Sequence, residues 1–183
     1  MERLSSRLDR RTITMKLLFE NWRKHLQEGS NRTILYHSTP PHQAEVIEAN
    51  GIKIGSEGIG FMIGGNWADE VYGTRPIYLS AKPGEGGGRE YEGTIFEVDV
   101  TGLELYPDLP TLVDYGAYTE EDGMWWDYDE IPSEMENVVD DDGFVEFEEF
   151  LDPDSPAAGA AIHLTGTAVV LEDIPPERIR RLS

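Results

Sequence analysis

The sequence predicts an α+β fold, in which a sheet of short strands is accompanied by few helices. Two apolar β-type runs, residues 34–37 (ILYH) and 75–80 (RPIYLS), each bring a ring side chain next to hydroxyl residues. A third run, residues 93–100 (GTIFEVDV), alternates apolar and polar side chains with the period of two that is typical of a half-buried strand. Between the first two runs, a helix-like stretch at about 41–50 begins with proline and ends at Gly51.

The length and composition predict a globular chain with one domain and some additional segments. The chain has 183 residues, of which 39% are hydrophobic, so it is long enough to bury a core. No apolar run reaches the length of a membrane span, and no secretory signal is expected at the N-terminus. The chain contains no Cys, which excludes disulfides, thiolate catalysis and cysteine zinc sites, and which fits a cytoplasmic location.

The charge is distributed unevenly along the chain. The formal net charge is −21, yet residues 1–32 hold eight Lys and Arg against four Asp and Glu. Residues 103–154, which we call the acidic segment, hold nineteen Asp and Glu and no Lys or Arg. Because nucleic-acid affinity depends largely on cations that neutralise phosphates, direct nucleic-acid binding by this segment is not expected. A solvated surface is the simplest interpretation, and docking of a basic protein partner or mimicry of nucleic acid is the alternative.

The N-terminal residues are predicted to lie outside the main domain. Residues 1–14 are polar and basic, which predicts a disordered tail. Residues 15–28 (MKLLFENWRKHLQE) predict an amphipathic helix that ends at the polar turn 29–31. The apolar side chains at helical spacing are Leu18, Trp22 and Leu26. We therefore expect a basic tail and helix over 1–32 and a single domain over 33–183.

The first half of that domain carries most of the recognisable elements. We expect a strand at 33–37, a helix at about 41–50 and a loop at 55–65, which holds five glycines and is placed to cover a ligand. A short helix at 66–72 and a strand at 75–80 follow.

The second half is dominated by an acidic insertion at about 109–160. Residues 140–143 (DDDG) predict an exposed turn, and they lack the alternating ligands and distal Glu of an EF-hand, so no metal site is expected. Three phenylalanines have a spacing compatible with a helix (Phe144, Phe147 and Phe150). A final strand is predicted at 162–171.

The order and spacing of these segments resemble the ADP-ribosyltransferase fold, in the branch whose motif is His, then Tyr, then an acidic residue. Residues 35–39 (LYHST) are similar to the family's Tyr-His-Gly-Thr strand, residues 44–53 to the helix and turn that follow, and residues 77–80 (IYLS) to its Val-Tyr-Leu-Thr strand. Residues 93–102 resemble the strand that leads to the acidic position. Residues 166–179 resemble the last strand and its Ile-Pro-Pro-Glu-Arg-Ile ending. The arrangement is most similar to the small bacterial enzymes that ADP-ribosylate rifampicin.

The resemblance covers roughly residues 33–109 and 162–182 and implies both a fold and an activity. The fold is a split, mainly antiparallel mixed sheet with a cleft for NAD between its two halves. The activity is the transfer of ADP-ribose from NAD to a protein or a small molecule. The catalytic residues implied are His37, Tyr78 and Asp108.

Each of these residues has an implied role. His37 hydrogen-bonds a ribose hydroxyl, while its backbone and the hydroxyl of Ser38 or Thr39 position the nicotinamide amide. Tyr78 stacks on the nicotinamide ring. Ser80 is the remaining residue implied in NAD binding. Asp108 stabilises the positive charge that develops on the ribose, as carboxylates do in glycosidases, and no metal is required.

Some of these assignments have alternatives. Glu104 and Glu120 are alternatives for the acidic residue, and Asp108 alone is also compatible with an ordinary turn carboxylate. His37 alone is compatible with a strand-end histidine that is satisfied by a backbone carbonyl, and Tyr78 with core packing. Ser38 stands where the family usually has Gly.

Three other functions remain open. An RNA 2′-phosphotransferase shares the fold, but it needs several basic residues, and its first motif residue is Arg where this chain has His37. A non-catalytic protein of the same fold would use the acidic segment for docking. Residues 15–28 resemble the leader peptides of proteins packaged in tailed-phage heads, with 26–29 (LQEG) similar to the site cut by head-maturation proteases. An ordinary helix packed on the domain is the preferred alternative to that leader.

Overall fold

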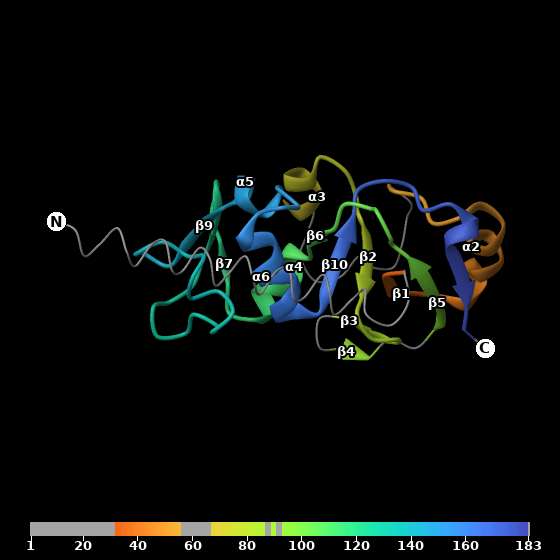
Figure 1. The fold of residues 1–183 in the computed structure, drawn as a ribbon, viewed down its shortest axis with the longest axis horizontal. Helices are drawn as coiled ribbons and strands as arrows, with labels where there is room; N and C mark the ends of the chain where they lie inside the picture. The colour runs from red at the N-terminus through yellow and green to blue at the C-terminus, as the bar shows by residue number, and fades with distance from the viewer. Residues whose placement is uncertain (1–31, 56–66, 87–88, 91–92, 183) are drawn as a thin grey trace.

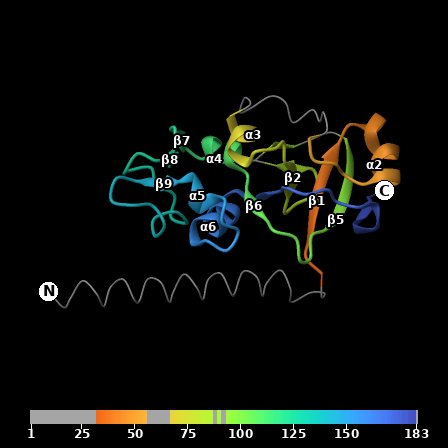
Figure 2. The same cartoon turned by 90° about the horizontal axis from the view of Figure 1, so that it is seen from above.

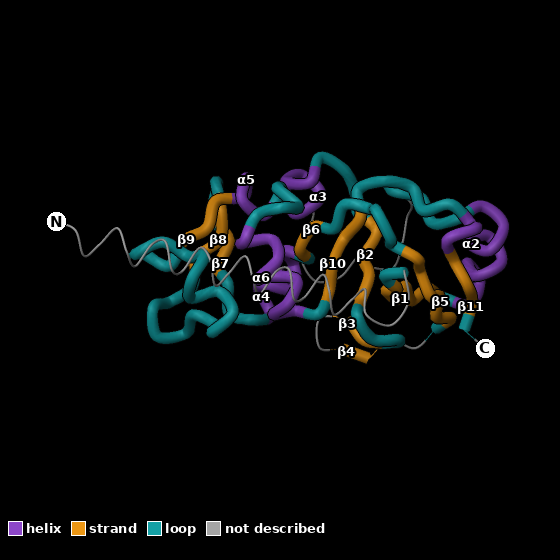
Figure 3. The backbone as a smooth tube through the Cα atoms, viewed as in Figure 1, coloured by secondary structure: helices purple, strands orange, loops and turns teal. Residues whose placement is uncertain are grey.

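The computed structural model describes residues 32–55, 67–86, 89–90 and 93–182, and it shows an α+β architecture of short helices and antiparallel sheets (Figure 1). Coloured by secondary structure, much of the chain between these elements is loop (Figure 3). The coarse fold class predicted from the sequence is therefore confirmed. The tail and helix predicted over residues 1–28, and most of the loop predicted at 55–65, lie outside the described residues. No described helix has the length and apolarity needed to cross a membrane.

Six strands form the main sheet. They are β1 (Ile34–Thr39), β2 (Ile77–Ser80), β5 (Thr94–Asp99), β6 (Tyr106–Pro107), β10 (Thr167–Val170) and β11 (Ile179–Arg181). Their order is β11-β5-β1-β2-β10-β6, and each neighbouring pair is antiparallel. The sheet expected to be mixed is thus antiparallel throughout the strands that the structure describes.

The sheet is weakest at its centre. β1 pairs with β5 at six register positions, and β2 pairs with β10 at four. Between β1 and β2, only Tyr36 and Ser80 are paired. We call this junction, where residues 36–39 run past residues 77–80, the β1–β2 seam.

One face of the sheet is covered by α2 (Ala44–Asn50), which follows the short 3₁₀ turn η1 (Pro41–Gln43). Ala44 and Ile47 on this helix pack with the side chains that alternate inward from β1 and β5. Gly51 ends the helix with a φ of 79°, and a Cβ there would lie 2.2 Å from the carbonyl oxygen of Ile174. Only glycine therefore allows the chain to leave α2 so close to the segment before β11. The inward side chains of the two strands are Leu35, Phe96 and Val98.

The other face is covered around β2, β10 and β6 by three helices. They are α3 (Trp67–Tyr72), α4 (Leu109–Asp114) and α6 (Pro156–Thr165). Their buried side chains form a second core cluster with Val169, and Tyr78 packs against it. Seen from above, α3 lies beside β2, and α4 and α6 lie between the sheet and the strands at the far end of the molecule (Figure 2). Each face of the sheet therefore has its own core.

Those far strands belong to the acidic segment. They are β7 (Tyr118–Thr119), β8 (Gly123–Trp125) and β9 (Phe144–Glu146), which form a three-stranded antiparallel sheet, and α5 (Phe147–Phe150) follows. Both views place this sheet at the opposite end of the molecule from α2 (Figures 1 and 2). The remaining strands, β3 (Glu85–Gly86) and β4 (Arg89–Glu90), form a short hairpin after β2.

Two predictions in the second half of the chain need correction. Most of the first half of the strand predicted at 162–171 is the end of α6, and β10 begins only at Thr167. The Ser155 hydroxyl accepts a hydrogen bond from Ala158 N–H (3.0 Å) as the N-cap, and Gly166 ends α6 with a φ of 64°. Because this helix is buried on most sides, it lacks the polar stripe that identifies an amphipathic helix. The helix predicted from the phenylalanine spacing begins only at Phe147, since Phe144 lies on β9.

Candidate active site

His37 and Tyr78 meet at the β1–β2 seam. His37 Nδ1 lies 3.0 Å from the backbone carbonyl oxygen of Tyr78. A carbonyl oxygen only accepts hydrogen bonds, so Nδ1 carries the proton and donates it. The imidazole thus hydrogen-bonds a strand carbonyl beside the single register pair of the seam. The ring nitrogen that remains, Nε2, is an acceptor with no hydrogen-bond partner among the described residues.

The surroundings of His37 keep its ring neutral. Burial lowers the pKa of His37, and the hydrogen bond to Tyr78 opposes this only in part. A neutral imidazole with a protonated Nδ1 has a lone pair on Nε2. The residue can therefore accept a hydrogen bond from a hydroxyl group at neutral pH. The same hydrogen bond is also compatible with the alternative in which His37 is an ordinary strand-end histidine, because its partner is a backbone carbonyl oxygen.

Tyr78 lies on the opposite pleat of β2 from Leu79 and packs against the core cluster that contains α3 and α4. The residue is half-buried. Burial raises the pKa of Tyr78 far above its usual value, and the charges of Asp108 and Asp69 raise it further, while Arg75 lowers it. The phenol therefore stays protonated. These shifts also identify Asp108 and Asp69 as the carboxylates whose charge reaches Tyr78.

Asp108 is the N-cap of α4 and is only 7% exposed. One carboxylate oxygen accepts from the Thr111 backbone N–H (3.1 Å) and the other from the Thr111 hydroxyl (2.8 Å). Burial raises the pKa of Asp108, while Thr111 and the nearby Thr167 hydroxyl lower it. The Thr167 oxygen is itself buried and makes no hydrogen bond of standard geometry within the described chain. The charge of Asp108 thus acts on Tyr78, but both carboxylate oxygens already accept hydrogen bonds from Thr111 in the first turn of α4.

The three hydroxyl residues predicted to bind NAD differ in their availability. The Thr39 hydroxyl donates to Gln43 Oε1 (3.0 Å), and the Ser80 hydroxyl donates to the Lys82 carbonyl oxygen (2.5 Å). Both side chains are buried. Ser38 is half-buried, and its hydroxyl has no hydrogen-bond partner among the described residues. Of the three, Ser38 is the hydroxyl that remains free for a ligand.

The alternative acidic residues lie elsewhere. Glu104 is exposed and accepts a hydrogen bond from the Tyr106 hydroxyl (2.8 Å). Glu120 is exposed in the turn between β7 and β8, where its N–H donates to the Gly123 carbonyl oxygen (2.9 Å). Neither carboxylate is among the charges that shift the pKa of Tyr78. The structure therefore does not bring either of them to the β1–β2 seam.

One acid near Tyr78, Asp69, was not found from the sequence, and Arg75, which was a candidate for the phosphate side of an NAD site, is its ion-pair partner. Asp69 lies in the first turn of α3, and its Oδ2 is 3.6 Å from Nε of Arg75. Their side chains are 30% and 29% exposed. On the same helix, the Tyr72 hydroxyl donates to the Pro107 carbonyl oxygen (2.5 Å) and accepts from the Leu109 N–H (3.0 Å), which joins α3 to the start of α4. Nothing in the local sequence indicates these contacts, because they depend on how α3 packs on the sheet.

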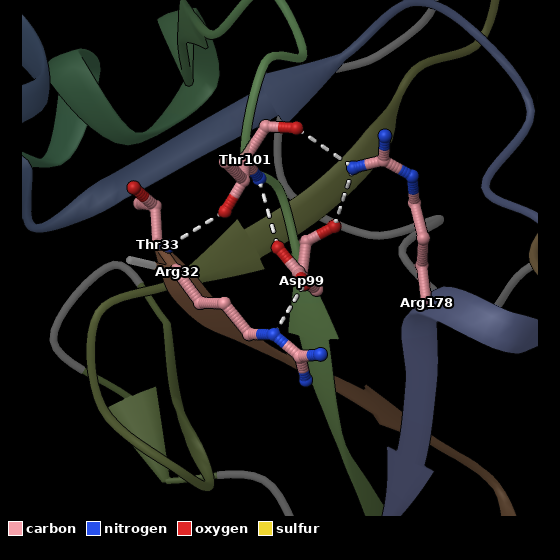
Figure 4. Close-up of polar contacts among 5 residues, drawn as sticks. All are labelled: Arg32, Thr33, Asp99, Thr101 and Arg178. Carbon is pink, nitrogen blue, oxygen red and sulfur yellow. Dashed lines mark hydrogen bonds and ion pairs between the residues drawn. The ribbon is translucent and has the colours of Figure 1, made fainter. Parts of the chain in front are cut away.

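The Ile-Pro-Pro-Glu-Arg-Ile ending has a structural role in this chain. Arg178 Nη1 donates to the carbonyl oxygens of Asp99 (3.0 Å) and Thr101 (2.9 Å) (Figure 4). The Asp99 carboxylate accepts from the Thr101 N–H (3.1 Å) and forms an ion pair with Arg32 (3.6 Å). Partial burial alone would raise the pKa of Asp99, but the Thr101 hydrogen bonds, Arg32 and Arg178 together lower it. The motif thus ties the C-terminal strand to the end of β5 rather than to the seam.

Comparisons with known proteins found no match for this chain, whether among family models, curated proteins or solved structures. Within the described residues, no group of three or more His, Cys, Asp or Glu side chains is arranged to hold a metal ion.

Proposed function

We propose that the chain is a mono-ADP-ribosyltransferase that cleaves NAD at the β1–β2 seam and transfers ADP-ribose to a protein or small-molecule acceptor. The observation that carries the proposal is the 3.0 Å contact between His37 Nδ1 and the Tyr78 carbonyl oxygen. It joins His37 to the backbone of the strand that carries Tyr78. The register places the imidazole on the face of the sheet that Phe96 shares and the Tyr78 ring on the opposite face with Val169. NAD would therefore bind across the β1–β2 seam, with its nicotinamide stacked on Tyr78 and a ribose hydroxyl donating to Nε2 of His37.

The chemistry would need little more than binding and electrostatics. The bond between ribose C1′ and the nicotinamide nitrogen breaks, and its electron pair stays on nicotinamide. The transition state resembles an oxocarbenium ion, so a nearby carboxylate lowers its energy. Nε2 of His37 would accept from a ribose hydroxyl, the Tyr78 ring would stack on nicotinamide, and the Ser38 hydroxyl would contact its amide. Among the described residues, Asp69 and Asp108 are the carboxylates whose charges act on Tyr78.

Two other functions are less well supported. An RNA 2′-phosphotransferase would need cations to hold RNA and the transferred phosphate. Several described cations are instead paired with carboxylates: Arg32 with Asp99, Lys53 with Asp173, Arg75 with Asp69, and Arg181 with Glu48. A non-catalytic protein that docks a basic partner is favoured by the uninterrupted negative charge of the acidic segment. It would give no role to Nε2 of His37 and the Ser38 hydroxyl, neither of which has a hydrogen-bond partner within the described part of the chain.

If the transferase proposal holds, the enzyme acts in the cytoplasm. The leader-like residues 15–28 suggest a route from a phage head into a host cell.

The test is nicotinamide release from NAD by the purified chain, with host lysate as a source of acceptor. We expect release by the wild type, a fall of about a hundredfold in His37→Ala and Tyr78→Ala, and a smaller fall in Tyr78→Phe, which keeps the ring. His42→Ala is the matched control, because His42 is exposed on η1 and should retain full release. If the wild type neither binds NAD nor releases nicotinamide, with or without lysate, the transferase proposal is wrong and the docking protein is the better account.

A further inference from the structure

The resemblance implies Asp108 as the carboxylate that acts on the ribose, but its geometry suits another role. Both of its oxygens accept from Thr111, and only 7% of the residue is exposed. A carboxylate that stabilises a ribose cation needs lone pairs that face the ligand. Burial also raises the pKa of Asp108, which disfavours the charge that the reaction needs. Asp108 therefore fits a residue that holds α4 in place.

Asp69 has the properties that Asp108 lacks. Its side chain is 30% exposed, and its position is fixed by the ion pair with Arg75, whose Nε is 3.6 Å from Oδ2. Arg75 lies just before β2, and its carbonyl oxygen accepts from the Gly55 N–H (3.0 Å), so the arginine backbone is held as well. Because the Asp69 carboxylate is paired with Arg75 and partly exposed, it can accept a hydrogen bond from a ligand without breaking a hydrogen bond within its own helix.

The helix that carries Asp69 packs on the same side of the sheet as Tyr78. Trp67 and Val71 of α3 pack against the same core cluster as the Tyr78 ring. Figure 2 shows α3 beside β2, which is the strand that carries Tyr78. The charge of Asp69 acts on both Tyr78 and Tyr72, which agrees with this placement. A ligand stacked on Tyr78 would therefore be within reach of the charge of Asp69, an acid that is partly exposed.

We propose that Asp69 is the catalytic carboxylate, contacting the ribose of NAD bound at Tyr78, and that Arg75 and Asp108 are positioning residues. This inference rests on the proposed transferase function. In the step itself, the C1′–N bond breaks with both electrons leaving on nicotinamide, and the Asp69 charge stabilises the cation at C1′. A bond then forms between C1′ and an oxygen or nitrogen of the acceptor, whose proton passes to solvent. The step is redox-neutral and needs no further reactant.

The experiment compares Asp69→Asn with Glu70→Gln and Asp108→Asn. Glu70 is the matched control, because it is the next acid on α3 and is exposed to solvent. For each variant we would measure nicotinamide release, the Kd for NAD by isothermal titration calorimetry, and the Tm by circular dichroism. A fourth variant, Asp69→Ala, is assayed with and without sodium formate, which can replace a missing carboxylate but cannot repair a structural defect.

We expect Asp69→Asn to lower release about a hundredfold with Kd and Tm close to wild type, and formate to restore part of the activity of Asp69→Ala. Glu70→Gln should match the wild type, and Asp108→Asn should lose less than tenfold. An active wild type whose Asp69→Asn variant keeps more than half of its release would overturn the assignment of Asp69 and leave the transferase function standing. Loss in Asp69→Ala that formate does not restore would also overturn it. A wild type that is inactive towards NAD would overturn both proposals.

Discussion

The main sheet and the acidic segment differ in how their charged side chains are paired. Around the sheet, cations are paired with acids, as in Lys53 with Asp173 (3.0 Å) and Arg181 with Glu48 (3.5 Å). The acidic segment has nineteen acids and no Lys or Arg, so none of its acids has a partner cation within the segment. Its order must come largely from apolar burial, and six large side chains in it are fully buried. These are Leu109, Leu112, Met124, Trp126, Met135 and Phe150.

The acidic segment thus differs from the β1–β2 seam, where we propose that NAD binds. The acidic segment buries its large apolar side chains in the core cluster that it shares with α3, α6 and Val169, and it exposes most of its charges, with Asp108 as a buried exception. The β1–β2 seam instead has a single register pair, and Nε2 of His37 has no hydrogen-bond partner among the residues that the structure describes. A ligand bound at the seam, as we propose for NAD, would supply the partner for this nitrogen.

The largest effect on stability should follow from Trp126→Ala. Trp126 is fully buried in the acidic segment, and its Nε1 donates to the Tyr115 carbonyl oxygen (3.3 Å). Loss of this side chain should lower the free energy of unfolding by about 3–5 kcal/mol, as measured by urea denaturation. The control is Tyr128→Ala, since Tyr128 is 82% exposed and should change the free energy by less than about 0.5 kcal/mol. Equal effects of the two variants would show that the segment does not depend on its apolar core.

A smaller effect, with a dependence on pH, is expected at Asp108. Its pKa in the folded protein is raised above 3.8, so the folded state holds a proton that the unfolded state has already lost. The stability this gives is present below the unfolded pKa and is lost as pH rises through the folded pKa. Asp108→Asn keeps an N-cap and removes the charge, so its advantage over wild type should grow from pH 4 to pH 7. Asp108→Ala should be less stable than Asp108→Asn by about 0.5–2 kcal/mol at every pH.

Thermal or urea unfolding of these variants across that pH range checks the expectation. A difference between Asp108→Asn and wild type that does not change with pH would show that Asp108 is not buried as a charge. That result would also restore Asp108 as a carboxylate available to the ligand.

Much of the fold was accessible from the sequence, and the reason lies in local pattern. The strand around His37, the strand ending at Ser80 and the alternation along β5 were all predicted, because each shows its period within a few residues. The α6 segment was partly misassigned as a strand, although Ser155, Pro156 and Gly166 are ordinary helix-end signals. Small apolar residues that are buried on most sides carry no period that distinguishes a helix from a strand.

The candidate site was accessible only in part. The resemblance paired His37 with Tyr78, and the structure places them 3.0 Å apart through the Tyr78 backbone. The roles assigned to both residues remain predictions. Asp69 was not found, since its closeness to Tyr78 arises from the packing of a six-residue helix on the sheet. The hydrogen bonds with Thr111 show that Asp108 is the N-cap of α4. The sequence does contain a signal for this role, because an Asp three residues before a Thr is a recognisable capping pattern.

The smallest effects concern single surface charges, and they should have opposite sign in the two regions. Lys53→Ala removes an exposed ion pair near the sheet and should lower the free energy of unfolding by less than about 1 kcal/mol. Asp141→Asn removes one of many like charges from the acidic segment and should raise it by a few tenths of a kcal/mol. Both effects should become smaller between about 0.02 and about 0.5 M NaCl, because salt screens interactions between exposed charges. Effects of the same sign would mean that charge repulsion within the acidic segment does not lower the free energy of unfolding.

The most direct test of the account is the protonation state of His37, read from the long-range ¹H–¹⁵N correlation spectrum of the histidine imidazoles at pH 7. We expect a neutral ring protonated at Nδ1, with an Nε2 resonance that shifts when NAD is added, while the exposed His42 and His163 do not respond. A charged ring, a proton on Nε2, or a His37 signal that is unchanged by NAD would contradict the claim that the β1–β2 seam holds an acceptor for the ribose of NAD.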